Sequence, residues 1–154
     1  MSSERIFSVA KDIQTTPPPS TMEKSALFAI NTYKGTKYNL GNGPLNDGYH
    51  MAKTIKNLGF DCYALVDGKK GDFLKNLQHF LKTTTDKLVI YYIGHGVNVK
   101  DRDGDEADGM DEAMFFSDGT LVDDILVQQL KLKKESSKVV LVTDACHSGS
   151  IWDI

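Results

Sequence analysis

The feature that most constrains the fold of this chain is the alternation of short apolar runs with longer segments of helical period. The apolar runs are typical of buried strands, and the longer segments have the spacing of amphipathic helices. The runs cover residues 26–30, 61–66, 87–93 and 138–143, and the helical segments cover about 47–58, 72–81 and 122–134. Strands that alternate with helices imply a parallel sheet covered on both faces. We therefore expect an α/β fold.

The chain ahead of the first apolar run predicts no regular structure. Residues 1–25 contain little apolar material, and their TTPPPST stretch can continue neither a helix nor a central strand. We interpret residues 1–25 as a flexible leader and residues 26–154 as one domain. A chain of 154 residues, 40% of them hydrophobic, is long enough to bury one sizeable core.

Charge and composition argue against several kinds of partner. The net charge of −3 and the pI near 5.8 give no basic face for nucleic acid or for an anionic membrane surface. No apolar run has the length of a membrane span, and the N-terminus lacks the hydrophobic core of a signal peptide. Two cysteines are too few for a disulfide framework, so we expect free thiols and a location in the cytoplasm or nucleus.

Two short motifs place candidate catalytic residues at the ends of predicted strands. KLVIYYI leads into GHG at 94–96, and KVVLVT leads into DAC at 144–146. If these strands are parallel neighbours, His95 and Cys146 emerge at the same edge, where ligands gather in open sheets. An imidazole can hold a thiol deprotonated and then protonate a leaving group. The flanking glycines leave room for a substrate chain, and the Gly96 and Cys146 N–H groups are candidate donors to an oxyanion.

The other cysteine and histidines have simpler interpretations. Cys62 lies inside the run DCYALV and is expected to be a small core residue. His50 and His79 lie in predicted helices without a partner in the sequence, which favours surface or half-buried packing. His147 follows Cys146 directly, but successive residues at a strand end point in different directions, so His147 is a poor base for Cys146.

Taken together, the motifs resemble a known family. GHG after a buried strand, the acidic run DRDGDEADGMDEA at 101–113 and DACHSGS look like the large catalytic subunit of a metacaspase. INTYKGTKYNLGNGPLND at 30–47 is similar to the family's segment between first strand and first helix, so the resemblance covers about residues 26–154. It implies a caspase-like sandwich, a dyad of His95 and Cys146, and hydrolysis of peptide bonds after Arg or Lys. True caspases fit less well, because their QAC is DAC here.

Two aspartates are candidates for a pocket that selects a basic side chain, because paired carboxylates bind guanidinium and ammonium groups strongly. Asp144 projects on the same side of its strand as Cys146. Asp47 matches the family's other pocket carboxylate, although a helix N-cap explains it nearly as well. The family commonly has YSGHG where this chain has YYIGHG, so Ile93 removes a hydroxyl from the expected pocket.

The acidic run raises the question of a cation site. As an EF-hand loop it has Glu106 at the obligatory glycine position and no flanking helix pair, which disfavours that site. Charged loops are usually solvated, but crowded carboxylates repel one another unless a cation or solvent spreads the charge. The resemblance implies an activating Ca²⁺ ion held by Asp111, Asp123, Asp124 and Asp153. Asp123 and Asp124 could instead be helix-start acids that favour the helix dipole.

The chain stops at Ile154, where the family would continue into a small subunit that completes the sheet and part of the substrate groove. We therefore expect a small-subunit partner beside an unpaired edge strand. The chain is then a processing product, a truncation or a natural single-subunit protein. The family also implies autoprocessing and a role in programmed cell death.

Two function classes stay open. The first is a calcium-dependent cysteine endopeptidase that cuts protein or peptide substrates after Arg or Lys. The second is a non-catalytic regulatory module of the same fold that binds a full-length protease or another partner. The intact pair of His95 and Cys146 favours the first class, and the missing small subunit favours the second. A cysteine phosphatase is excluded, because SGSIWDI lacks the arginine that a phosphate loop needs.

Overall fold

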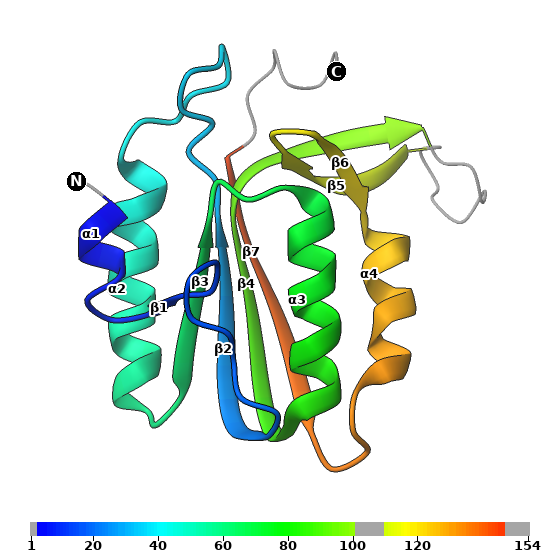
Figure 1. Cartoon of the computed structure of the whole chain (residues 1–154). Helices are drawn as coiled ribbons and strands as arrows, with labels where there is room; N and C mark the ends of the chain where they lie inside the picture. Colours follow the sequence, from blue (N-terminus) through cyan, green and yellow to red (C-terminus); the bar gives the residue numbers. More distant parts are fainter. Residues whose placement is uncertain (1–2, 101–109, 147–154) are drawn as a thin grey trace.

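The computed structural model describes residues 3–100 and 110–146. Helices and strands alternate through most of the chain, and a pair of antiparallel strands begins at residue 110 (Figure 1). In chain order the elements are α1 (Ser3–Ile6), β1 (Lys11–Asp12), β2 (Met22–Ile30), α2 (Gly43–Asn57), β3 (Asp61–Val66), α3 (Lys70–Thr83), β4 (Thr84–Lys100), β5 (Met110–Phe116), β6 (Gly119–Val122), α4 (Asp123–Gln129), the 3-10 helix η1 (Leu130–Leu132) and β7 (Lys138–Cys146).

The described strands form one seven-stranded sheet with a parallel body and an antiparallel extension. The body has the order β1-β3-β2-β4, and β7 also pairs in parallel with β4. The last residues of β4 run on past the body and pair antiparallel with β5, which pairs in turn with β6. The expectation of a mostly parallel sheet with helices on both faces is confirmed (Figure 1).

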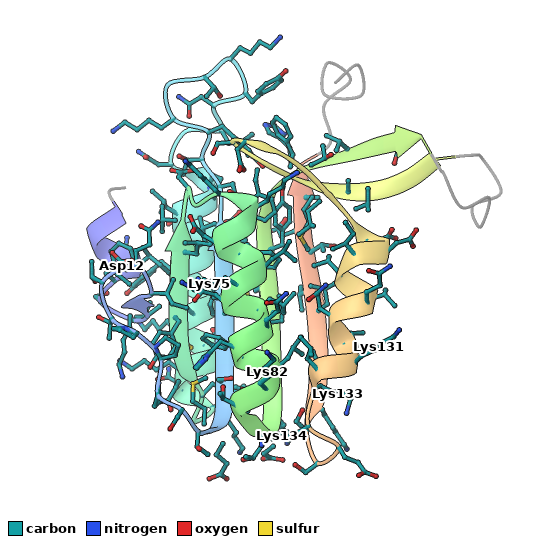
Figure 2. The ribbon with its side chains drawn as sticks, turned by 45° about the vertical axis from the view of Figure 1, so that its right-hand side comes forward. Asp12, Lys75, Lys82, Lys131, Lys133 and Lys134 are labelled. Carbon is teal, nitrogen blue, oxygen red and sulfur yellow. The ribbon has the colours of Figure 1, made fainter. Side chains whose placement is uncertain are left out.

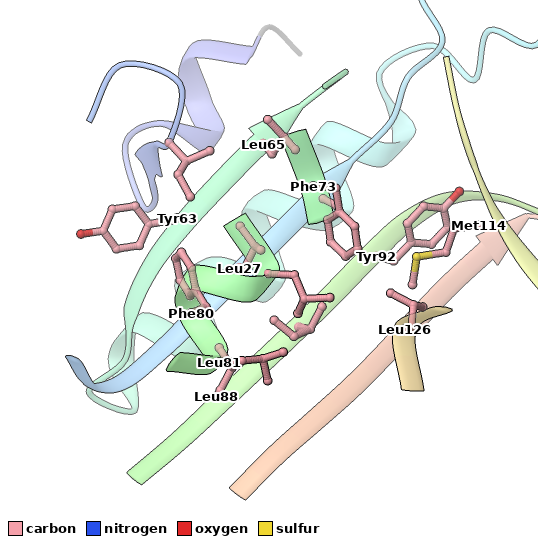
Figure 3. Packing of buried hydrophobic residues seen from close by; sticks show 14 of the residues in the cluster. Leu27, Tyr63, Leu65, Phe73, Phe80, Leu81, Leu88, Tyr92, Met114 and Leu126 are labelled. Carbon is pink, nitrogen blue, oxygen red and sulfur yellow. The ribbon is translucent and has the colours of Figure 1, made fainter. Parts of the chain in front are cut away.

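Different helices cover the two faces, because side chains alternate along each strand. On one face Leu27 of β2 belongs to a buried cluster with Phe73 of α3 and Leu126 of α4 (Figure 3). On the other face the next residue, Phe28, belongs to a cluster with Ala52 of α2. Each large apolar side chain buried in this way contributes roughly 1.5–3 kcal/mol. Burial on both faces explains why the parallel strands read as continuous apolar runs.

The expectation that residues 1–25 form a flexible leader is wrong for the part that the structure describes. Ile6 is fully buried in the cluster under α2, and β1 pairs in parallel with β3. β2 begins at Met22, earlier than predicted, and the Pro19 carbonyl lies 3.0 Å from Nε2 of His79 on α3. The prolines exclude a helix and a central strand, but they allow an extended segment along a sheet edge. β1, ahead of the prolines, therefore covers part of the outer edge of β3.

Two helix boundaries also differ from the sequence expectation. α2 has Asn42 as its N-cap and Pro44 in its first turn, so Asp47 lies in the second turn. Proline suits a first turn because its missing N–H would have no intrahelical partner there. The N-cap alternative for Asp47 is therefore wrong. The helix predicted over 122–134 is shorter, since α4 ends at Gln129 and η1 follows it.

Exposed lysines line the side of the molecule formed by α3 and the segment after α4. Figure 2 labels Lys75 and Lys82 of α3 together with Lys131, Lys133 and Lys134. A chain with a net charge of −3 thus still carries a lysine-rich flank, which the net charge alone does not predict.

None of the helices described in the structure is long and apolar enough to cross a membrane.

Candidate active site

The two predicted catalytic positions meet at one edge of the parallel sheet. The register between β4 and β7 runs from Lys87 opposite Lys138 to His95 opposite Cys146. Paired positions on adjacent strands lie about 4.8 Å apart, which is within reach of neighbouring side chains. The adjacency that the two motifs predict is confirmed, whereas the catalytic roles of His95 and Cys146 stay a prediction.

His95 is buried, and one nitrogen of its ring has a defined partner. The residue is 4% exposed, and its ring centroid lies 4.8 Å from that of Tyr33. Its Nε2 lies 2.8 Å from the backbone carbonyl oxygen of Tyr38. Because a carbonyl oxygen can only accept, this contact assigns the hydrogen to Nε2 and leaves the lone pair of the neutral ring on Nδ1. Nδ1 is then the nitrogen that can take up a proton.

Two tyrosine hydroxyls hold the backbone around His95. The Tyr33 hydroxyl accepts a hydrogen bond from the His95 N–H at 2.8 Å and donates one to the Phe115 carbonyl at 2.7 Å. The Tyr92 hydroxyl donates to the His95 carbonyl and accepts from the Phe115 N–H at 3.0 Å. Both tyrosines are buried, so water does not compete for these bonds. They fasten the GHG stretch of β4 to β5.

The two hydroxyls lie so close to the Gly94 backbone that only glycine fits at this position. A Cβ at Gly94 would lie 2.5 Å from Oη of Tyr33 and 2.7 Å from Oη of Tyr92. A real Cβ cannot approach so closely, so any larger residue would displace one of the phenols. The expectation that Gly94 leaves room for a substrate chain is wrong, because the side chains of the protein itself fill that space.

Gly96 lies between strand β5 and a pocket beside α4. It pairs with Met114 of β5, and together with Ala145 of β7 it lines a pocket of about 290 Å³ beside α4. The proposed donation of the Gly96 and Cys146 N–H groups to an oxyanion stays a prediction.

The two predicted pocket carboxylates act on one phenol. Asp144 is half-buried and lies opposite Ile93 in the register, and Asp47 is exposed on α2. Burial raises the pKa of Tyr91 above its usual value, and the negative charges of Asp144 and Asp47 raise it further. Tyr91 belongs to the cluster under α2, so both carboxylates lie near this face of the sheet. Their binding of a basic substrate side chain stays a prediction.

Ile93, where the resembling family has serine, is a core residue. It is buried in the cluster under α2. A Cβ at Gly48 would lie 2.5 Å from Cδ1 of Ile30 and 3.5 Å from Cδ1 of Ile93, so α2 packs closely on both isoleucines. A serine hydroxyl in this apolar setting would need a hydrogen-bond partner. Packing therefore accounts for the isoleucine.

The predicted calcium ligands lie partly within the described residues. β5 and β6 pair antiparallel up to the residue before Asp123, which brings Asp111 and the start of α4 to the same end of this strand pair. Asp124 follows in the first turn of α4. Asp153 lies outside the described residues. Among the residues that are described, no group of three His, Cys, Asp or Glu side chains gathers as a metal site.

One observation nevertheless fits a cation at this end of the sheet. Oδ1 of Asp123 is buried and has no hydrogen-bond partner among the described residues. A buried carboxylate oxygen without a partner is costly, and oxygen donors of this kind are the ligands that Ca²⁺ prefers. The calcium site itself stays a prediction.

The second cysteine is a core residue, as the sequence predicts. Cys62 is buried, and its Sγ lies 3.8 Å from the carbonyl oxygens of Ala52 and Phe60. Burial and the adjacent Asp61 carboxylate raise the pKa of the Cys62 thiol to about 12, against an opposing effect of Lys56. A thiol with such a pKa is unreactive at neutral pH.

Sequence reasoning missed three residues that organise this site, Tyr33, Tyr38 and Asp67. The two tyrosines stand in a stretch whose only recognised signal was its resemblance to the family segment. Asp67 directly follows β3, and a polar residue at the carboxyl end of a parallel strand was the one local sign of its importance. The contacts of these three residues join segments that are far apart in the chain, so no local sequence pattern predicts those contacts.

Comparison with known proteins identifies the class of protein to which this fold and site belong. The caspase domain family matches residues 23–153. The chain therefore belongs to the caspase-domain family of cysteine peptidases.

Within that family the chain is similar to metacaspases. It is 31% identical over 150 residues to Metacaspase-1 of Candida glabrata, covering 85% of this chain and 38% of the relative. It is 32% identical over 157 residues to Metacaspase-2 of Arabidopsis thaliana, covering 90% of this chain and 37% of the relative. The chain thus spans less than half the length of these relatives. The metacaspase resemblance is confirmed.

A solved structure supports the fold. The crystal structure of a protein from Geobacter sulfurreducens matches with a TM-score of 0.70 and 28% sequence identity, covering 83% of this chain and 52% of that chain. The predicted caspase-like α/β sandwich is confirmed by this match together with the family match.

Proposed function

We propose that this chain carries the catalytic centre of a cysteine endopeptidase that cuts peptide bonds after Arg or Lys. Cys146 is the nucleophile and His95 is the base. The observation that carries the proposal is the strand register that sets His95 opposite Cys146. The Tyr38 carbonyl at Nε2 adds support, because it favours the tautomer in which Nδ1 accepts a proton.

The proposed reaction begins with transfer of the Cys146 thiol proton to Nδ1 of His95. The thiolate attacks the carbonyl carbon of the scissile bond, and the N–H groups of Gly96 and Cys146 donate to the oxygen that becomes negative. The C–N bond breaks as the imidazolium gives its proton to the leaving amine, which leaves a thioester on Cys146. Water, deprotonated by His95, then hydrolyses the thioester, and the carboxylic acid product leaves as the thiol re-forms.

The proposed specificity rests on Asp47 and Asp144. Their shared effect on Tyr91 supports a negative region on the α2 face of the sheet. A guanidinium or ammonium group would pair with these carboxylates, whereas an Asp side chain of a substrate would be repelled. Truncating Asp144 to alanine is expected to cost about 2–4 kcal/mol in transition-state binding, as for one partner of a desolvated charge pair.

Calcium is the proposed activator. The unpaired oxygen of Asp123 supports the site, and Asp111, Asp124 and Asp153 would complete it. When bound, the ion would neutralise these carboxylates and hold their segments together without entering the chemistry.

The calcium proposal is tested by calorimetric titration of Ca²⁺ into the parent and into the double variant Asp123→Ala with Asp124→Ala. We expect a dissociation constant of about 10⁻⁵ to 10⁻³ M for the parent, and no measurable binding by the double variant. Equal binding by both proteins, or full activity in excess chelator, contradicts it.

An exposed apolar edge supports the proposed small-subunit partner. Val140 and Leu141 of β7 are 54% and 47% exposed, and Val127 of α4 is 61% exposed. Within the described sheet β7 pairs with β4 alone, so its outer side can accept a further strand. The relatives extend beyond the part that this chain spans, and their additional part is the occupant that we propose for this edge.

The same edge favours a second candidate function, a non-catalytic module that binds a full-length protease. A cleavage assay separates the two functions. Peptides with Arg, Lys or Asp before a reporter group are incubated with the chain, with and without calcium. Cleavage after Arg and Lys that is lost in Cys146→Ala and kept in Cys62→Ala supports the peptidase. Cleavage after Asp contradicts the specificity, and turnover by Cys146→Ala contradicts the nucleophile.

A further inference from the structure

The loop that follows β2 holds His95 from two sides, and Asp67 holds that loop. We infer that Asp67 and Tyr33 are positioning residues that set the His95 ring for proton transfer, an inference that rests on the proposed peptidase function. Tyr33 contacts His95 directly. Asp67 acts through Thr32 and Tyr33.

Asp67 joins the ends of two neighbouring parallel strands. It directly follows β3, and its N–H donates to the carbonyl of Ile30, the last residue of β2, at 2.8 Å. Its Oδ1 accepts from the N–H groups of Thr32 at 2.7 Å and Tyr33 at 3.2 Å, and its Oδ2 accepts from the Thr32 hydroxyl at 2.6 Å. One carboxylate therefore satisfies three donors at the start of the loop, through charge-assisted bonds stronger than neutral ones.

Both residues have an unusual backbone conformation. The φ angles are 56° for Tyr33 and 52° for Asp67, which is the left-handed region. This region is disfavoured for a bulky side chain such as tyrosine and persists only where surrounding contacts hold it, often at functional sites. The bonds from Asp67 hold the Tyr33 N–H, and Thr36 donates from its N–H and its hydroxyl to the Tyr33 carbonyl at 3.1 and 2.8 Å.

From this anchored start the loop makes two contacts with His95. The Tyr33 hydroxyl accepts from the His95 N–H at 2.8 Å, and the Tyr33 ring packs against the imidazole. The Tyr38 carbonyl accepts from Nε2 at 2.8 Å. The Leu40 N–H closes the loop on the Thr32 carbonyl at 2.8 Å. A shift at Thr32 would therefore move both the acceptor that selects the tautomer and the acceptor that holds the His95 backbone.

A purely structural role predicts a different result from a positioning role. If the network only stabilises the fold, removing it lowers the unfolding midpoint and leaves the imidazole of the folded protein unchanged. If it positions His95, the folded variant has a mixture of ring tautomers and a slower chemical step. A misplacement of about 1 Å is enough to cost up to about a hundredfold in rate.

The first test is ¹⁵N NMR of the imidazole nitrogens, which reads the tautomer without any substrate. The variants are Tyr33→Phe, which keeps the ring and loses the hydroxyl, Asp67→Ala, and the conservative Asp67→Asn, which keeps one acceptor oxygen. Asp72→Asn, which changes an exposed carboxylate in the first turn of α3, is the matched control. We expect a single Nε2–H tautomer in the parent and the control, a mixture in Tyr33→Phe and Asp67→Ala, and partial recovery in Asp67→Asn.

The second test is steady-state cleavage of an Arg peptide by the same proteins. We expect kcat to fall between about tenfold and about a hundredfold in Tyr33→Phe and Asp67→Ala with KM little changed, and a smaller fall in Asp67→Asn. Parent-like imidazole spectra in folded Tyr33→Phe and Asp67→Asn would overturn the positioning role. An inactive parent with the expected NMR changes in its variants would overturn peptidase activity of this chain alone and leave the positioning role in place. Asp67→Asn and Tyr33→Phe keep the test decisive if Asp67→Ala fails to fold.

Discussion

Replacement of Gly94 by alanine tests the packing of the two phenols behind His95. The added Cβ would lie 2.5 Å from Oη of Tyr33 and 2.7 Å from Oη of Tyr92, well below the roughly 3.5 Å of an unstrained contact. Both hydroxyls are buried and hydrogen-bonded, so neither can move without breaking a bond. Overpacking costs about 1–3 kcal/mol, and a buried group that loses its partner costs about 1–3 kcal/mol more. We expect a loss of about 2–6 kcal/mol in the free energy of unfolding.

Urea unfolding followed by circular dichroism measures this loss. The matched control is Gly71→Ala in α3, where nothing lies within 4 Å of the added Cβ. This substitution is expected to stabilise the protein by about 0.5–1 kcal/mol, because alanine restricts the unfolded chain more than glycine does. If Gly94→Ala is as stable as the parent, the phenols are not packed against Gly94 and the reasoning is refuted.

Three further predictions concern the cysteines, Tyr91 and the N-terminal segment. A thiol-alkylating reagent at mildly acidic pH is expected to label Cys146 well before Cys62, because burial and a neighbouring carboxylate raise the pKa of Cys62 to about 12; equal labelling by mass spectrometry contradicts an activated Cys146. The raised pKa of Tyr91 means that above about pH 10 the unfolded chain releases a proton that the folded protein keeps, so stability falls as the pH rises. Asp144→Asn should lower the pKa of Tyr91 and reduce that fall, and an unchanged alkaline unfolding profile speaks against the contact. Deletion of residues 1–21 is expected to destabilise the protein by about 3–6 kcal/mol through lost burial and an uncovered β3 edge, and an unchanged urea midpoint contradicts this packing.

The parallel body of the sheet and the His95–Cys146 edge could be predicted because their signals are local. An apolar run such as KLVIYYI predicts a buried strand by its own composition. A motif directly after that run must then lie at the carboxyl end of the strand. Once two such strands are neighbours, their register brings the motifs together. The prediction therefore needed only one assumption about long-range order, the adjacency of β4 and β7.

The N-terminal segment and the support of His95 could not be predicted, because both depend on contacts between distant parts of the chain. Nothing in the residues around Lys11–Asp12 shows that β1 pairs with β3, since strand pairing depends on a partner elsewhere. The sequence alone does not distinguish Tyr33 from the other aromatic residues. Its role depends on the hydrogen bond that its hydroxyl donates to the carbonyl of Phe115 in β5. Asp67 likewise has no pattern of its own, and its role is visible only in the bonds to Thr32 and Tyr33.

The described contacts divide the site into an organised side and an exposed side. On the side of the proposed base, His95 is buried, and its ring and backbone are held by Tyr33 and Tyr38. On the side of the proposed nucleophile, β7 carries exposed Val140 and Leu141 and ends at Cys146. A strand added to that edge would bury such side chains, each worth roughly 1.5–3 kcal/mol, and would restrain the strand that ends at Cys146. The contacts that hold His95 thus lie within this chain, so we propose that a partner docking on β7 would act on the position of Cys146.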